Sequence, residues 1–214
     1  MIDSYRHKGL RKQLVTEIRH KGISDENVLR AIGNVPRHLF LDSSFLKFAY
    51  EDKPFPIGSG QTISQPYTVA FQTALLQVKK RDKILEIGTG SGYQACVLIE
   101  LGANVFSIER QKNLYTKTRQ FLPTIGYQAR MFFGDGYKGL PTFAPFDKII
   151  VTAGAPYIPQ PLIDQLKVGG ILVIPVGDDV QIMTTIIRES ENNFIKEEHG
   201  SFRFVPLVND KGTD

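Results

Sequence analysis

Glu86-Ile87-Gly88-Thr89-Gly90-Ser91-Gly92-Tyr93 is the stretch that decides the fold class of this chain. An apolar run that reads as a strand ends at Ile87, and a helical pattern begins at Tyr93. Glycines between a strand and a helix let the backbone approach a ligand closely and adopt positive φ. This context is typical of a nucleotide-binding turn, and a purely structural tight turn is the alternative. Dinucleotide-binding turns have a third glycine where Tyr93 stands, so the pattern disfavours a dinucleotide oxidoreductase.

Strand and helix signals alternate after residue 82. Apolar runs predict strands over residues 84–87, 105–108, 128–133, 148–151 and 171–174, with two further β-like segments at 181–188 and 202–208. Helices are predicted over residues 93–101, 113–122 and 159–167, the second of them stopped by Pro123. Such alternation is typical of βαβ units. We therefore predict an α/β fold with a doubly wound, mostly parallel sheet of seven strands, in a core formed by residues 82–214.

The first 81 residues have a different, mostly helical texture. Apolar residues recur at helical spacing over residues 4–21, which predicts a helix there. A second helix is expected to begin at Ser24 as its N-cap, and a third to follow Ser64. Residues 36–63 read as one long irregular segment, which is either functional or a linker. We expect residues 1–81 to form a helical, substrate-side extension of a single compact domain.

Acidic residues follow two of the predicted strands. Parallel sheets bind ligands at the carboxyl ends of their strands, so the loops after four strands are expected to converge on one crevice. Glu109 ends the second strand, where an acid can accept both hydroxyls of an adenosine ribose. Asp135 and Gly136 follow the third, where the carboxylate can meet the exocyclic amine of adenine. A surface carboxylate and a simple Asp-Gly turn are the alternatives.

The composition is that of an ordinary globular chain, because 42% of its 214 residues are hydrophobic and 22% are charged. The apolar runs are far shorter than the ~18–20 residues of a membrane-spanning helix, so no membrane partner is expected. A single cysteine, Cys96, excludes an internal disulfide, and the sequence offers no cysteine–histidine cluster for a metal. The N-terminus does not resemble a signal peptide. We expect a cytoplasmic monomer.

The charge of the chain is concentrated at one end. A net charge of +4 results from 26 basic and 22 acidic residues, and the whole excess lies in residues 1–21. A solvated helix face explains this better than a nucleic-acid site, which usually combines a denser basic stripe with aromatic residues. No nucleic-acid partner is expected.

Several segments resemble one enzyme family. The glycine turn, Glu109 and Asp135 together resemble the S-adenosylmethionine (AdoMet) methyltransferases with a Rossmann-like fold. Four segments along nearly the whole chain are similar to protein-L-isoaspartate O-methyltransferases: Gly-Gln-Thr-Ile-Ser-Gln-Pro-Tyr at 60–67, Phe-Gly-Asp-Gly at 133–136, Leu-Lys-Val-Gly-Gly-Ile-Leu at 166–172 and Phe-Val-Pro-Leu-Val at 204–208. Residues 152–156, Thr-Ala-Gly-Ala-Pro, also look like this family.

This resemblance implies an AdoMet-dependent carboxyl O-methyltransferase that leaves S-adenosyl-L-homocysteine. In the family the acceptor is the free α-carboxylate of an L-isoaspartyl residue in a damaged peptide or protein. The methyl ester collapses to a succinimide, whose hydrolysis returns some normal aspartate. The resemblance implies these acceptor-side residues: Gln61, Thr62, Ile63, Ser64, Val205, Pro206, Leu207 and Val208. It implies these cofactor-side residues: Glu86, Gly88, Thr89, Gly90, Ser91, Gly92, Glu109, Asp135 and Gly136.

Ser64 is the catalytic candidate, since the resemblance implies that its hydroxyl orients the acceptor carboxylate by a hydrogen bond. A second interpretation makes Ser64 the N-cap of the helix that contains Pro66, and the two interpretations are compatible. The N-terminus of that helix is also expected to attract the carboxylate. An α-carboxyl group with a pKa of about 3.3–3.7 is ionised at neutral pH, so its methylation needs no general base.

Two other functions stay open at the level of sequence. One is an AdoMet methyltransferase acting on RNA or a small molecule. The acid-or-Asn, Pro-Pro, aromatic signature of amino methylation is absent after the fourth strand, and the only cysteine lies in the first crossover helix. The other is a non-catalytic AdoMet-binding module, which the presence of Ser64 beside the glycine crevice disfavours.

Overall fold

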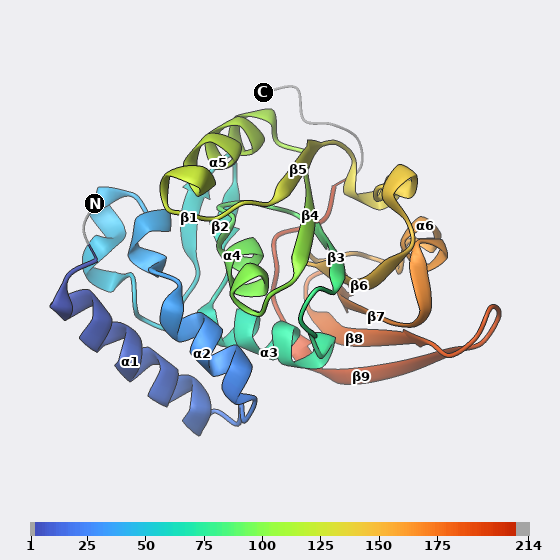
Figure 1. The fold of residues 1–214 in the computed structure, drawn as a ribbon, viewed down its shortest axis with the longest axis horizontal. Coiled ribbons are helices and arrows are strands. Elements are labelled where there is room, and N and C mark those ends of the chain that lie inside the picture. Colours follow the sequence, from blue (N-terminus) through green and yellow to red (C-terminus); the bar gives the residue numbers. More distant parts are fainter. Residues whose placement is uncertain (1–2, 209–214) are drawn as a thin grey trace.

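One seven-stranded sheet forms the centre of the molecule (Figure 1). The computed structural model describes residues 3–208. The strand order is β5-β4-β3-β6-β7-β8-β9. The first five of these strands are parallel, and β8 pairs antiparallel with both β7 and β9. The strands are β3 (Lys83–Ile87), β4 (Asn104–Glu109), β5 (Arg130–Phe133), β6 (Phe146–Val151), β7 (Leu166–Val176), β8 (Gln181–Arg188) and β9 (Phe194–Phe202).

Helices cover both faces of this sheet, as Figure 1 shows. On one face lie α3 (Pro66–Leu76), α4 (Tyr93–Glu100) and α5 (Lys112–Thr124), and on the other lies α6 (Gln160–Asp164). Successive side chains of a strand point to opposite faces. Ile84 therefore packs in the cluster of α3 and α4, whereas its neighbour Leu85 packs in the cluster that contains Leu162 of α6. The predicted α/β fold with a doubly wound, mostly parallel seven-stranded sheet is confirmed.

The N-terminal segment, drawn in blue to cyan in Figure 1, adds a further layer outside α3 and α4. It comprises α1 (Tyr5–His20), α2 (Glu26–Asn34), the 3₁₀ helices Arg37–Phe40 and Ser43–Phe48, and a hairpin of β1 (Phe55–Gly58) and β2 (Gln61–Ile63). Ile18 and Ile32 of this layer share one buried apolar cluster with Val69 of α3 and Cys96 of α4. The extension therefore packs directly on the helices that flank the sheet.

Three local expectations about the helices are wrong. Asp25, and not Ser24, caps α2, because the Asp25 carboxylate accepts hydrogen bonds from the N–H groups of Asn27 and Val28. Pro123 does not stop α5, which runs one residue further, to Thr124. Residues 36–63 are not irregular throughout, because two 3₁₀ helices and the β1–β2 hairpin lie within them.

The last strand of the sheet also differs from the expectation. The seventh strand is Phe194–Phe202. Residues 205–208, which were expected to belong to a strand at 202–208, instead form an isolated bridge between Gly154 and Pro206, outside the strands of the sheet. Strand β9 is an exposed edge rich in charged residues, so the apolar pattern that reveals buried strands is absent from it. The prediction followed the apolar residues, of which those at 205–208 line a pocket, whereas Phe202 and Phe204 pack against the sheet.

No helix within residues 3–208 combines the length and the apolar character that crossing a lipid bilayer requires.

Candidate functional site

A pocket lies at the carboxyl ends of β3 and β6. The chain passes from β3 outward to β4 and β5 and then returns to place β6 on the other side of β3, so the strand order reverses at this point. Open α/β sheets bind their ligands at such a switch point. The residues that line the pocket are Gln61, Thr62, Ile63, Ser64, Val69, Ile87, Gly88, Thr89, Gly90, Ser91, Tyr93, Gln94, Ile108, Glu109, Arg110, Gly136, Thr152, Ala153, Val205, Pro206, Leu207 and Val208.

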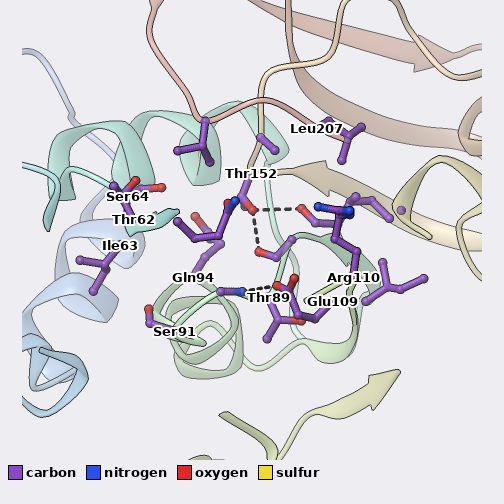
Figure 2. A pocket seen from close by; sticks show the side chains of 18 of the residues that line it. Thr62, Ile63, Ser64, Thr89, Ser91, Gln94, Glu109, Arg110, Thr152 and Leu207 are labelled. Atoms are coloured by element: carbon purple, nitrogen blue, oxygen red, sulfur yellow. Dashed lines mark hydrogen bonds between the residues drawn. The ribbon is translucent and has the colours of Figure 1, made fainter. Parts of the chain in front are cut away.

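Figure 2 shows how the two groups of predicted residues face each other across this pocket. Thr62, Ile63 and Ser64 lie on one side, and Glu109 and Arg110 lie on the other, with Thr89 of the glycine turn next to Glu109. The convergence of the loops after β3, β4, β5 and β6 is as predicted, since each of these loops contributes lining residues.

The glycine turn is held against β6 by Thr152. The Thr152 hydroxyl lies 2.7 Å from the carbonyl oxygen of Gly88 and 3.0 Å from that of Ile87. Gly88 has a φ of +92°, and a Cβ atom there would lie 2.7 Å from the Thr152 hydroxyl oxygen. Only glycine therefore allows this close approach of the two strand ends. Backbone groups of the glycine turn therefore form one wall of the pocket at the switch point.

Glu109 ends β4 and binds the glycine turn directly. Its side chain is buried, with 5% exposure, and its Oε2 accepts a hydrogen bond from the Gly90 N–H at 2.8 Å. Its Oε1 accepts another from the Gln111 N–H at 2.8 Å. A carboxylate offers about four acceptor positions, so both oxygens retain capacity for ligand hydroxyls. The structure thus holds Glu109 rigidly at the pocket wall.

Glu86 does not line the pocket. It is completely buried beneath the turn and accepts a hydrogen bond from the Ser107 hydroxyl, which lies 2.6 Å from the Thr89 hydroxyl. Burial, opposed by the Ser107 hydrogen bond, raises the pKa of Glu86 to about 8. Glu86 is thus mostly protonated at neutral pH and supports Thr89, which does line the pocket.

Gly92 and Asp135 also lie outside the set of lining residues. A Cβ atom on Gly92 would lie 2.8 Å from Thr118 Cγ2, so this glycine allows the turn to pack against α5. The Asp135 carboxylate caps a 3₁₀ turn by accepting the Tyr137 N–H at 2.9 Å. The cofactor contacts expected for Glu86, Gly92 and Asp135 stay predictions, whereas Gly88, Thr89, Gly90, Ser91, Glu109 and Gly136 do line the pocket.

All eight residues expected on the acceptor side line the same pocket. Gln61–Ile63 form strand β2, and Ser64 follows directly. Residues 205–208 reach the pocket from the other end of the chain because Gly154 holds them: its N–H donates to the Val205 carbonyl at 2.8 Å, and its carbonyl accepts the Leu207 N–H at 2.7 Å. The Tyr137 hydroxyl donates to the Leu207 carbonyl at 3.2 Å.

Ser64 does not cap α3. The N-cap position belongs to Gln65, and the Asp52 carboxylate accepts the Tyr67 N–H at 2.7 Å. Pro66 offers no N–H, and the Tyr67 N–H is already taken by Asp52, so the first turn of α3 has fewer free N–H groups for the acceptor carboxylate than the sequence suggested. The Ser64 hydroxyl makes no hydrogen bond to any residue between 3 and 208. It lines the pocket and is available to a ligand.

A family model described as protein-L-isoaspartate(D-aspartate) O-methyltransferase (PCMT) matches residues 9–212. The chain belongs to this family. The resemblance of its motifs to the protein-L-isoaspartate O-methyltransferases is thereby confirmed.

Relatives of the PCMT family are similar over the full length of the chain. A protein-L-isoaspartate O-methyltransferase from Christiangramia forsetii is 64% identical, over 99% of this chain and 100% of that protein. A solved protein-L-isoaspartate O-methyltransferase is 28% identical, with a TM-score of 0.84, over 94% of this chain and 67% of that one. A crystal structure from Plasmodium falciparum, of a chain assigned to the same activity and in complex with S-adenosyl-L-homocysteine, is 26% identical with a TM-score of 0.79, over 92% and 98% of the two chains.

Sequence reasoning did not single out Gln94 in this PCMT-family pocket. The Thr73 hydroxyl donates to the Val69 carbonyl at 2.7 Å, so Thr73 can only accept from the Gln94 side-chain amide, at 3.0 Å. This chain of hydrogen bonds fixes the amide with its Oε1 turned away from Thr73. Oε1 is buried and has no hydrogen-bond partner within the part of the chain described. A buried acceptor of this kind suits a ligand that brings an N–H donor.

Other lining residues of the pocket were also missed as site residues: Val69, Ile87, Tyr93, Ile108, Arg110, Thr152 and Ala153. For Ile87, Tyr93, Arg110, Thr152 and Ala153 the available signal was position, since each ends or follows a strand or begins the helix after the turn. Sequence also gave no sign of a second polar cluster, in which Asp3, His7 and His38 place possible metal-ligand atoms within 4.8 Å of one another. Asp3 there forms a two-point ion pair with Arg11, which already balances its charge.

Proposed function

We propose that this protein is an AdoMet-dependent methyltransferase that esterifies the free α-carboxylate of L-isoaspartyl residues in peptides and proteins, and so begins their repair through a succinimide. The observation that carries the proposal is the position of Ser64. Its hydroxyl has no partner within residues 3–208, and it shares one pocket with Glu109 and the glycine turn. Membership of the PCMT family supports the same activity.

The residues of the pocket fit AdoMet. Glu109 offers carboxylate oxygens for ribose hydroxyls, and Ile87, Ile108 and Leu207 offer apolar walls for the adenine ring. The Oε1 of Gln94, which is buried and has no hydrogen-bond partner among residues 3–208, suits the ammonium group of the methionyl part. AdoMet supplies, when bound, a methyl group on a sulfonium, and methyl transfer leaves S-adenosyl-L-homocysteine, the molecule found in the solved relative from Plasmodium falciparum.

The chain then contributes orientation more than covalent chemistry. The Ser64 hydroxyl donates a hydrogen bond to one oxygen of the acceptor carboxylate and leaves the other oxygen to attack the methyl carbon. No proton is transferred, because the carboxylate is already ionised at neutral pH. Holding two reactants in line can supply several kcal/mol of the rate enhancement. Peptide backbone on either side of the isoaspartyl residue pairs with the segments 61–63 and 205–208, as an added strand does.

The two parts of the chain serve different sides of the site. Residues 1–81 supply Ser64 and β2 on the acceptor side, and residues 82–214 hold the cofactor and add the segment 205–208. Cys96 is buried, and burial raises the pKa of its thiol, so it is poorly suited to the role of nucleophile. This disfavours a cysteine-dependent base methylase among the alternative RNA or small-molecule methyltransferases. A non-catalytic AdoMet-binding module would have no use for the available Ser64 hydroxyl.

We further propose a cytoplasmic monomer that binds no nucleic acid. A free, buried cysteine suits a reducing compartment. The excess positive charge lies on α1. Its Arg19 is paired with Glu26, and its C-cap residue Lys21 is paired with Glu17 and Asp52. Sedimentation should give one species of 24.0 kDa. Gel-shift titration at ~0.15 M salt should show only weak, steeply salt-dependent binding, and sequence-selective RNA binding would contradict the proposal.

The activity is tested with labelled AdoMet and paired peptides that differ only in carrying isoaspartate or aspartate. Base-labile label on the isoaspartyl peptide alone is the expected result, because a carboxyl methyl ester is cleaved by base. Label on both peptides, or on RNA and neither peptide, would overturn the proposal. Calorimetry with AdoMet and NAD is the companion measurement, and tighter binding of NAD would contradict the cofactor assignment.

A further inference from the structure

Arg37 is a completely buried arginine that holds the segment around Ser64. It begins the 3₁₀ helix Arg37–Phe40 and has no exposed surface. Its Nη1 donates to the Ala49 carbonyl at 2.7 Å, and its Nη2 donates to the carbonyls of Lys53 at 2.8 Å and Ser64 at 3.1 Å. One guanidinium thus fixes three backbone carbonyls that lie up to 15 residues apart along the chain.

The same guanidinium also contacts the cofactor side of the pocket. It lies 5.7 Å from the ring centroid of Tyr93, the first residue of α4 after the glycine turn, and 5.4 Å from that of Phe55 in β1. Cations over aromatic rings are attracted by the ring quadrupole. Arg37 therefore joins the Ser64 backbone to the start of the helix that follows the glycine turn.

Asp52 holds the residues on the other side of Ser64. Its side chain is 2% exposed, and it accepts the Tyr67 N–H at 2.7 Å and the Gln65 side-chain amide at 2.9 Å. Lys21 balances its charge at 2.6 Å. The peptide units around Ser64 are therefore fixed by two buried charged groups, and the Ser64 hydroxyl is left outside both sets of hydrogen bonds.

We propose that Arg37 is a positioning residue for the methyl acceptor, and that it acts through the Ser64 carbonyl to fix the Ser64 hydroxyl relative to the glycine turn. This inference rests on the function proposed above. It assigns no contact between Arg37 and either substrate. The effect expected of Arg37 is on the alignment of the acceptor carboxylate, and so on turnover, more than on the binding of AdoMet.

The bonding of Arg37 is unusual for a residue that serves stability alone. A buried guanidinium carries a large desolvation penalty, which is normally offset by a carboxylate partner. Arg37 forms no salt bridge within residues 3–208, and its Nε has no hydrogen-bond partner there. Burial lowers its pKa to about 10, so it is still charged at neutral pH. The acceptors that it does have are three backbone carbonyls, and one of them is that of Ser64.

Arg11 provides a matched control. It is a second buried arginine of the N-terminal layer, with 6% exposure, and it bonds the Gly33 carbonyl, Tyr50 and Asp3. It has no bond to Ser64 and does not line the pocket. Replacing it with lysine removes a buried guanidinium in the same layer without touching the acceptor side. Arg11→Lys should therefore lower the melting temperature and leave kcat/KM unchanged.

The test compares Arg37→Lys, Ser64→Ala and the double variant in the isoaspartyl-peptide assay. Lysine keeps the charge but lacks the planar fork of N–H donors on two nitrogens that bonds the three carbonyls. A small misplacement of reacting groups can cost roughly 100-fold, so Arg37→Lys should lower kcat/KM by ~10- to 100-fold with AdoMet affinity nearly unchanged. Because Arg37 is inferred to act through Ser64, the double variant should be no slower than Ser64→Ala alone.

Two results would overturn the inference. The first is a lower melting temperature of Arg37→Lys with unchanged kcat/KM, which would make Arg37 a structural residue like Arg11. The second is a double variant whose loss of kcat/KM equals the product of the two single losses, which would show that Arg37 does not act through Ser64. If Arg37→Lys does not fold, Arg37→Gln, which is neutral and keeps an amide donor, replaces it. Failure of both to fold would assign Arg37 to stability and also contradict the inference. Failure of the proposed function is recognised separately, since the wild-type protein would then not methylate the peptide.

Discussion

The Asp52 carboxylate accepts the backbone N–H of Tyr67 at 2.7 Å and the side-chain amide of Gln65 at 2.9 Å, and so caps α3 from a separate segment of the chain. The Ser64 hydroxyl beside it therefore takes no part in the cap. This separates two roles that one serine before a helix can combine. It also gives the Ser64 substitution a clear expected outcome.

Ser64→Ala should lower kcat/KM for an isoaspartyl peptide while the melting temperature stays nearly unchanged. One lost hydrogen bond to a charged acceptor is worth roughly 1.5–3 kcal/mol, or ~10–150-fold. Peptide kinetics, AdoMet calorimetry and thermal unfolding on the same protein check this. Ser44→Ala, at an exposed serine outside the pocket, is the control. A loss of ~1 kcal/mol in stability with normal turnover would instead identify a cap.

Glu109→Gln should weaken AdoMet binding. The amide keeps the shape of the side chain but loses the charge and half of the acceptor capacity for ribose hydroxyls and for the Gly90 N–H. We expect a loss of roughly 1.5–3 kcal/mol, which is ~10–150-fold in affinity. Calorimetry measures it, with Glu191→Gln at an exposed glutamate as the control. Unchanged affinity would mean that Glu109 serves only to brace the turn.

Glu86 predicts a pH dependence of stability. Its pKa is raised by burial from 4.5 to about 8 in the folded state, so the folded protein binds one more proton than the unfolded chain between these values. This contribution to stability is complete below the unfolded pKa and is lost as the pH rises through 8. Glu86→Gln removes the titration. The free energy of unfolding of the variant, relative to that of the wild type, should rise by about 1.4 kcal/mol per pH unit from pH 5 to 8.

Urea unfolding of both proteins at several pH values measures the Glu86 effect. The control is the exposed Glu191→Gln, which should follow the wild-type profile. Parallel curves for Glu86→Gln and the wild type over this range would show that Glu86 is ionised in the folded protein, contrary to the prediction.

Gly92→Ala should destabilise the protein more than Gly126→Ala. Both glycines have nearly the same φ, +85° and +84°, so both substitutions carry a similar cost for positive φ. A Cβ at Gly92 would also meet Thr118 and Leu122 at 2.8 and 2.9 Å, whereas nothing lies within 4 Å at Gly126. Overpacking typically costs 1–3 kcal/mol, so denaturant unfolding should show a difference of about that size. Equal losses of stability in the two variants would contradict the packing role of Gly92.

The sequence predicted the glycine turn and the parallel strands well because their signals are local. Ile84–Ile87, the glycines and Tyr93 are adjacent in the chain, and an apolar run followed by glycines identifies a buried strand and its turn without further information. Glu109 was found by the same reasoning, because it ends the next strand. The prediction failed at β9, whose residues are exposed at the edge of the sheet and carry charges in place of an apolar pattern.

The sequence by itself therefore determined the α/β fold class, the position of the glycine turn and the presence of Ser64, Glu109 and the segment 205–208. Only the tertiary structure decided which of these residues meet. It moved Glu86, Gly92 and Asp135 out of the pocket wall and gave the cap of α3 to Asp52. It also placed Arg37 against the Ser64 carbonyl, 27 residues away in the chain. The physical reason is that helix and strand signals depend on neighbours within a few residues, whereas burial and hydrogen-bond partners depend on contacts that the folded chain alone brings together.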